Sequence, residues 1–267
     1  MSNSVISGIN AHIDGISTLR KWKVRMKNMV AEGAASDAPG GIQRLAGNKD
    51  WNGIYLAYGH TPVQFPGDAF SFSGDVDANY GISGTGIVDK ITLICPVEKG
   101  DRIEQIVEFS ANGALTAGAA AATAGATPAI YSAISRKVAL DTVDVTDVRG
   151  WKLVMSARNK PYASSTTAGQ VQRTAGNIDA QFEYMTYQDD ASQFPTEGDM
   201  SVVRFYVTAS TYWELTWGIF EEIGEWGGDL EGAENVGAVV RGSYSAFNST
   251  SMGTIRNPAG DYKYGSA

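Results

Sequence analysis

The chain has 267 residues, of which 43 % are hydrophobic and 19 % charged, and it carries a net charge of −8 at pH 7. This balance excludes wholesale disorder, and the acidic charge makes the chain a poor candidate for gripping nucleic acid. Abundant Gly and aromatic residues favour short strands and tight turns over helix bundles. We see no membrane-spanning stretch and no secretory signal pattern, and therefore expect a soluble protein that stays where it is made.

The most informative feature is an internal repeat. Residues 22–50 match residues 151–179 without a gap, at a shift of 151 minus 22, or 129, with 12 identities in 29 positions. Such a run in register predicts a tandem duplication. The tryptophans of the repeat are expected to anchor two cores, with an interface role as the alternative. The main repeated pairs are Trp22/Trp151, Arg44/Arg173, Gly47/Gly176, Asn48/Asn177 and Asp50/Asp179.

The repeat divides the chain into two domains of ordinary size. We predict the first β domain over residues 1–116 and an Ala/Gly-rich linker over 117–130. The second β domain follows over 131–248, and a polar C-terminal tail over 249–267.

Alternating apolar residues predict a similar series of strands in both copies. In copy one they are 5–16, 22–30, 51–58, 69–72, 86–95 and 102–110. In copy two they are 138–148, 151–157, 181–187, 200–208, 213–220 and 236–247. We prefer a strand to an amphipathic helix at 213–226, because this segment takes the place of 86–95.

Gly, Asn, Asp and Pro mark the connections between these strands. A polar loop is predicted over 32–41, and a hairpin turn over 98–101 has a length that hairpins favour. Further turns are predicted over 47–50, 60–62 and 65–68.

Several segments of copy one form a distinctive set of motifs. They are Ile16–Trp22, Gly40–Gly41, Arg44–Gly53, Phe65–Asp68, Ser83–Asp89 and Val107–Leu115. Together they resemble the major tail tube proteins of tailed bacteriophages, and the likeness covers most of copy one. Copy two keeps Arg149, Trp151, the block over 172–179 and Phe194-Pro195, but it lacks the Phe-Ser-Ala-Asn-Gly-Ala-Leu ending.

The resemblance implies a mainly β chain with two tandem homologous antiparallel β-sandwich or barrel domains, each with a short helix. Tube proteins of this family form hexameric rings, so three copies of a two-domain chain would form a pseudo-hexameric ring. Tethering raises the effective concentration of adjacent domains. The resemblance therefore implies a homotrimer in stacked rings, contacts with other virion proteins, and passage of DNA without specific binding. It also implies synthesis in the host bacterial cytoplasm, a place in the virion, and no membrane partner.

The sequence shows no arrangement typical of an enzyme. His12 and His60 lie in different segments, and neither stands beside a nucleophile as the base of a triad must. Cys95 lies in an apolar run and is expected to be a buried structural thiol. Because zinc spacings and Gly-rich phosphate loops are also missing, we predict no catalytic residue and no cofactor.

Asp75, Asp77 and Asn79 are the best metal candidates, because oxygen ligands at alternate positions resemble a calcium loop. The glycine and the final carboxylate of such a loop are not in place. We therefore prefer a solvated turn and predict no metal site.

The repeated polar residues are interpreted as structural. Asp50 and Asp179 are expected to cap turns, because duplication places them in separate domains and not across one catalytic cleft. Arg44 and Arg173 are expected to brace the same turn or to cross to an adjacent domain.

Copy two carries an acidic stretch that copy one lacks. Between Arg204 and Arg241 there is no Lys or Arg, and the seven acids are Glu214, Glu221, Glu222, Glu225, Asp229, Glu231 and Glu234. The stretch is either a solvated hairpin tip or a surface that meets a basic face on the next subunit or ring.

Three functions follow from these observations. A tail tube subunit is the leading hypothesis, and a capsid cement or decoration protein that forms trimers on the head is the alternative. A carbohydrate-binding β-sandwich is a third hypothesis, suggested by the Tyr and Trp content, and Tyr58 or Tyr187 would test it. An enzyme is the least expected class.

Overall fold

The computed structural model describes most of the chain. The described residues are 12–13, 16, 18–33, 43–59, 65–76, 79–119, 132–187, 195–209, 212–223, 235–242, 247–249 and 253–254. This part is mainly β, as the sequence predicts, and its only helical segment is the short 3-10 turn η2 (Ser165–Thr167). The short helix expected in each domain is not found within these residues.

The strands fall into two sets along the chain. The first half contains β1 (His12–Ile13), β2 (Leu19–Gly33), β3 (Gln43–Tyr58), β4 (Ala69–Asp75), β5 (Gly81–Cys95) and β6 (Glu104–Gly118). The second half contains β7 (Val138–Leu140), β8 (Val143–Asp144), β9 (Val148–Ala157), β10 (Lys160–Tyr162), β11 (Gln172–Thr174), β12 (Ile178–Tyr187), β13 (Met200–Tyr206), β14 (Tyr212–Ile223), β15 (Asn235–Gly242), β16 (Phe247–Ser249) and β17 (Gly253–Thr254).

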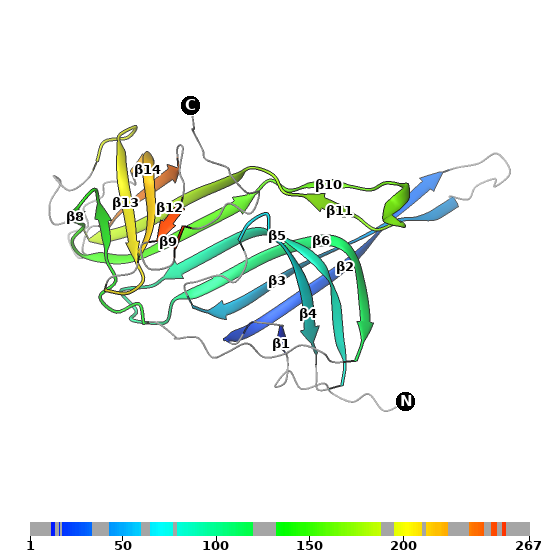
Figure 1. Ribbon diagram of the computed structural model, residues 1–267. Helices are drawn as coiled ribbons and strands as arrows, with labels where there is room; N and C mark the ends of the chain where they lie inside the picture. The colour runs from blue at the N-terminus through cyan, green and yellow to red at the C-terminus, as the bar shows by residue number, and fades with distance from the viewer. Residues whose placement is uncertain are drawn as a thin grey trace.

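One antiparallel sheet of 15 strands runs through both halves (Figure 1). Its main path is β2-β3-β6-β5-β9-β12-β15-β14-β13-β7-β8, and β4 pairs with β5 beside this path. Only β10 and β11 form a separate two-stranded sheet. The halves therefore share a sheet, and the pairing of β5 with β9 joins them.

The two halves have the same strand order and closely matched registers. Pairing follows β2-β3-β6-β5-β4 in the first half and β9-β12-β15-β14-β13 in the second. Trp22 lies opposite Tyr55 and Trp151 opposite Tyr184, so the β2–β3 register recurs at the shift of 129. The β5–β6 and β14–β15 pairs also match, and each has an irregularity at the same place, between Val88 and Lys90 and between Phe220 and Glu222.

The core is a single cluster of buried side chains that spans both halves. In the first half, Phe72 of β4 packs on Trp51 and Phe109, with ring centroids 6.0 and 5.3 Å apart. In the second half, Phe205 of β13 stacks on Phe182 at 4.5 Å. In each half the last strand of the order therefore covers the inner face of the others, which removes large aromatic surfaces from water.

The predicted turn at Gly47–Asp50 is wrong, because β3 continues through these residues. A Cβ atom on Gly47 would lie 2.7 Å from the carbonyl oxygen of Met29, and one on Gly176 only 1.8 Å from that of Arg158. Neither glycine has a positive φ. The repeated glycine therefore allows close approach of two backbones and does not form a turn.

Other predictions differ in their boundaries. The predicted strand over 138–148 is instead the hairpin β7–β8 and the start of β9, and the strand over 236–247 is divided between β15 and β16. Residues 117–118, predicted to begin the linker, belong to β6, and residues 32–33, predicted to begin a loop, belong to β2. The turn at 65–68, the hairpin turn near 98–101 and the strand at 213–220 are confirmed. The turn at 60–62, most of the 117–130 linker and most of the tail lie outside the described residues.

Candidate interaction interface

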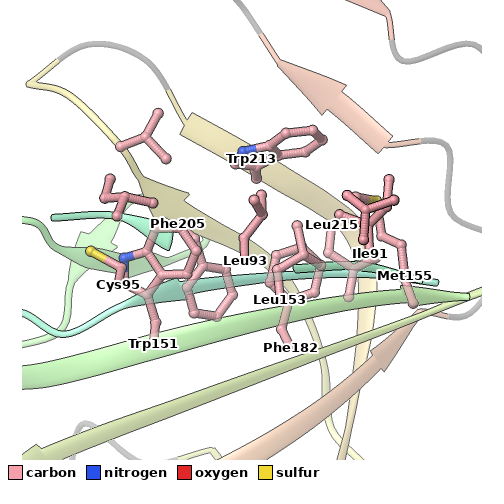
Figure 2. Close-up of a cluster of buried hydrophobic side chains, with 14 of the residues drawn as sticks. Ile91, Leu93, Cys95, Trp151, Leu153, Met155, Phe182, Phe205, Trp213 and Leu215 are labelled. Atoms are coloured by element: carbon pink, nitrogen blue, oxygen red, sulfur yellow. The ribbon is translucent and has the colours of Figure 1, made fainter. Parts of the chain in front are cut away.

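The junction between the halves is an antiparallel strand pair with a buried centre. Six residue pairs join β5 to β9, from Lys90 opposite Ser156 to Cys95 opposite Trp151. Leu93 and Leu153 lie opposite each other at its centre, and both are fully buried. Figure 2 shows these side chains beneath Trp213 and Phe205, so that strands of both halves contribute to one packed layer.

A polar cluster at one end of the junction also joins the halves. Arg149 Nε donates to Glu98 Oε2 at 2.9 Å, and the Tyr187 hydroxyl donates to Glu98 Oε1 at 3.1 Å. The Glu98 backbone N–H also donates to the Arg149 carbonyl at 2.7 Å. The hydrogen bond from Arg149 lowers the pKa of the Glu98 carboxyl, because it favours the charged form.

The second half sends an arm across the first. We define the second arm as residues 158–177, which include β10, η2 and β11 (Figure 1). This arm reaches Lys49 of β3. The Lys49 N–H donates to the Gly169 carbonyl at 2.8 Å, and the Val171 N–H donates to the Lys49 carbonyl at 3.0 Å. Asn159 Nδ2 donates to the Val88 carbonyl at 2.9 Å. The second arm is thus held by backbone and side-chain hydrogen bonds along its length.

Arg173 of the second arm makes several polar contacts with the first half. Its Nη1 and Nη2 donate to the two Asp50 carboxylate oxygens at 2.9 and 2.8 Å, and Nη1 also donates to the Ala111 carbonyl at 2.8 Å. Its backbone N–H donates to Asn112 Oδ1 at 3.0 Å. Only 13 % of the Arg173 side chain is exposed. This two-pronged geometry combines directionality with charge and makes Arg173 a clamp between the halves.

The first half has an arm with the same register but different surroundings. We define the first arm as residues 28–33 and 43–46, the distal parts of β2 and β3, which extend away from the rest of the sheet in Figure 1. Glu32 lies opposite Arg44 here, as Pro161 lies opposite Arg173 in the second arm. Arg44 Nε donates to Glu32 at 2.7 Å within the same arm, and its side chain is 60 % exposed.

The outer strand β2 of the shared sheet and the end of β14 beyond Ile219 carry opposite charge. In the described part of the chain, β2 pairs only with β3, and β13 covers β14 only as far as Ile219. The exposed bases of β2 are Arg20, Lys21, Lys23, Arg25 and Lys27. Glu221 and Glu222 are exposed at the end of β14. The sequence interpretation missed this basic run, although bases at alternate positions beside Trp22 were a visible signal.

The repeated tryptophans and asparagines differ in their surroundings. Trp151 is buried against Phe205, with ring centroids 5.4 Å apart, whereas Trp22 is half-buried and packs edge-on against Phe72 at 5.9 Å. Asn48 lies half-buried in β3. The Asn177 carbonyl accepts a hydrogen bond from the Arg158 N–H at 3.0 Å at the base of the second arm.

The aspartates of the repeat do not cap a turn of the kind that the sequence predicts. Asp50 lies within β3, where it accepts hydrogen bonds from the Trp51 N–H and from Arg173. Asp179 lies within β12, and Arg241 Nη1 donates to its Oδ2 at 3.3 Å. Both carboxylates therefore lie on strands and form ion pairs with arginines.

The acidic stretch is partly neutralised inside the second half. Arg204 Nε donates to Glu214 at 2.6 Å, and Arg241 bonds to Glu221. Glu222 is exposed at the strand end. The remaining members of the stretch, Glu225, Asp229, Glu231 and Glu234, lie outside the described residues.

Within the described residues, no group of three or more His, Cys, Asp or Glu residues is arranged to hold a metal ion. Asp75 is the last residue of β4 and lies opposite His12. Asn79 lies just before β5, and Asp77 lies outside the described residues.

Cys95 is buried, and this burial raises the pKa of its thiol to about 12, so the reactive thiolate is disfavoured.

The tyrosines considered for glycan binding are covered by arginines. Arg20 and Arg102 lie over the Tyr58 ring, 5.0 and 4.9 Å from its centroid, and Arg149 lies 4.7 Å from that of Tyr187. These cation–π contacts occupy faces that a sugar would stack on. A shallow hollow of about 90 Å³ lies elsewhere, lined by small residues of β5 and β6 and by Ser73.

Comparisons with known proteins give no family assignment. No model of a known protein family matches the chain, and no curated protein matches it. The described residues include no helix with the length and hydropathy needed to traverse a bilayer. The resemblance to tail tube proteins therefore stays a prediction from the sequence motifs.

Proposed function

We propose that this chain is a non-enzymatic virion protein, a tail tube subunit that assembles head to tail into rings of three chains. One observation carries the proposal. The β5–β9 junction already joins two halves of the same strand order, and within the described residues one side of β2 and one side of β14 beyond Ile219 have no paired strand. The β5–β9 pairing within one chain thus suggests how β14 of one chain would pair with β2 of the next.

The correspondence of the strands specifies how two chains would meet. Matching registers relate β9 to β2 at a shift of 129 and β5 to β14 at a shift of 220 minus 88, or 132. Lys90 opposite Ser156 then becomes Glu222 opposite Lys27 of the next chain. Opposite charges that face each other across antiparallel strands stabilise the pair.

The repeated methionine supports the same junction. Met155 lies opposite Ile91 in the junction and is 1 % exposed, whereas its counterpart Met26 is 70 % exposed. Ile223 holds the register position of Ile91 in the second half. A β14–β2 pair between chains would therefore bury Met26 as Met155 is buried, and burial of apolar surface favours association.

A closed ring also accounts for the charges on the open edges. Lysines on an edge strand oppose indiscriminate pairing with other chains, and an acidic edge compensates them selectively. A head-to-tail interface forms a ring when its rotation closes, and closure would pair both β2 and the end of β14 in every chain. Three chains per ring, the stacking of rings and the DNA channel are parts of the proposal that come from the family resemblance. The net charge of −8 fits a channel that offers few cations to phosphates.

Native mass spectrometry and negative-stain microscopy of the purified full chain test this function. The expected result is a species of three chains that forms rings or tubes with a central opening. A chain that stays monomeric at all concentrations, without rings, overturns the proposal. Addition to preformed heads without tubes would instead identify a capsid decoration protein, and saturable glycan binding without assembly would identify a carbohydrate-binding module.

A further inference from the structure

We propose that the first arm clasps the second half of a neighbouring chain, where Arg44 binds Asp179 as Arg173 binds Asp50 within one chain. The partner is a second copy of this chain. This inference rests on the proposed head-to-tail assembly and adds a contact remote from the paired strand edges.

The register of the two arms places the same residue types at matching positions. Arg44 and Arg173 are related by the shift of 129, and so are Asp50 and Asp179. Arg44 pairs across its ribbon with Glu32, and Arg173 with Pro161, in the same register. If one chain follows another as the second half follows the first, the first arm lies over β14 and β15 of the neighbour and reaches β12.

Exposure distinguishes the pair that forms within one chain from the pair proposed between chains. The side chains of Arg173 and Asp50 are 13 % and 20 % exposed, whereas those of Arg44 and Asp179 are 60 % and 39 % exposed. The same two residue types are therefore covered where both partners lie in one chain, and open where the partner would come from another chain. Bringing the open pair together would reproduce a two-pronged ion pair in a partly dry setting.

The second half already holds the carboxylate in place for such a partner. Arg241 bonds to both Glu221 and Asp179, with 3.3 Å to Asp179, so the three side chains form a chain of ion pairs at the surface. In the first half, Ser110 takes the place of Arg241 and bonds to Asp89. A preformed carboxylate reduces the ordering required on binding.

The first arm also carries apolar side chains that an interface would cover. Met29, Val30 and Leu45 are 46 %, 52 % and 72 % exposed on this two-stranded ribbon. An isolated hairpin is marginally stable in water, and contiguous exposed apolar side chains mark interaction surfaces. Docking of the arm would supply the packing partner that the ribbon lacks.

Cysteine cross-linking of the full chain tests the contact. The variant Arg44→Cys/Asp179→Cys is treated with a short bismaleimide, and we expect covalent dimers and trimers on a denaturing gel, which neither single variant gives. The matched variant Arg173→Cys/Asp50→Cys calibrates the linker, because it must join within one chain and leave the chain monomeric. The variant Arg44→Cys/Asp144→Cys, with its second cysteine on β8, must give no ladder.

The outcomes separate this inference from the proposed function. One set of outcomes overturns the clasp alone. In it, rings or trimers form normally and the matched variant is linked within one chain, but Arg44→Cys/Asp179→Cys gives no ladder. A wild-type chain that stays monomeric overturns both proposals. Since Arg44 and Asp179 are substantially exposed, the variants are expected to fold, and thermal unfolding checks this. As a further control, Glu32→Gln removes the ion pair within the first arm and must leave assembly unchanged.

Discussion

The two arms of this protein share one register but lie in different surroundings. Both are antiparallel ribbons in one register, and both carry the repeated arginine. The second arm lies on the first half of the same sheet, whereas the first arm extends away from the rest of the sheet in Figure 1. The comparison teaches that a repeated motif can bind in one copy and stand open in the other because of position alone.

The largest expected difference lies between Leu153 and its counterpart Val24. Leu153 is fully buried at the junction, so Leu153→Ala should lower the free energy of unfolding by about 2–5 kcal/mol. Val24 lies half-buried on the open β2 edge. Val24→Ala should therefore destabilise the monomer clearly less than Leu153→Ala does. Denaturant unfolding of both variants, at a concentration where chains do not associate, measures the difference. Equal losses would contradict the distinction between an occupied and an open edge.

The repeated arginines should differ in the same way. Arg173→Ala leaves Asp50 largely buried without its partner and should cost about 1.5–3 kcal/mol of stability. Arg44→Ala removes an exposed pair and should cost less than about 0.5 kcal/mol in the monomer. Thermal unfolding of both variants measures this contrast. A loss from Arg44→Ala as large as that from Arg173→Ala would show that the first arm is docked within its own chain.

Charge reversal on the open edges should act on association and not on folding. Lys27→Glu would place like charges opposite each other and weaken assembly by about two- to fivefold, equivalent to about 0.5–1 kcal/mol. Adding Glu222→Lys in the same chain should restore it. Analytical ultracentrifugation at low and high salt measures the change, because screening should reduce it. Failure of the double variant to recover would reject the Glu222–Lys27 register.

The smallest expected effect is the pH dependence of the Glu98 cluster. The folded state lowers the pKa of Glu98, so its contribution to stability is present above the ordinary glutamate value of about 4.3 and is lost as pH falls through the lowered value. Glu98→Gln should reduce the loss of stability on acidification through this range. Unfolding curves for the variant and the wild type at several acidic pH values would reveal it. Parallel pH profiles would mean that Arg149 does not favour the charged form.

Some of the fold follows from the sequence by simple physical rules. Alternation predicts the strands that begin near Trp22 and Trp151, and the repeat indicates correctly that residues 213–220 form a strand. The turn at Gly47 is predicted wrongly because a glycine permits both positive φ and close backbone approach, and sequence does not distinguish these uses.

The candidate interface was less accessible to prediction. The repeat identifies Arg173 and Asp50 as notable, but both copies contain the same pair, so only the sheet order reveals which pair closes within the chain. The contact between Glu98 and Arg149 joins residues 51 positions apart, from the β5–β6 turn of the first half to β9 of the second. Such pairs depend on long-range register, which local patterns do not encode.

The tethered halves would have a kinetic consequence for the proposed ring of three chains. Half of its junctions would form when each polypeptide folds, at a rate independent of the protein concentration. The other half would require collisions between molecules, so ring closure would wait until enough subunits have accumulated. The fusion of two halves in one chain would thereby divide assembly into a fast step within each chain and a concentration-dependent step between chains.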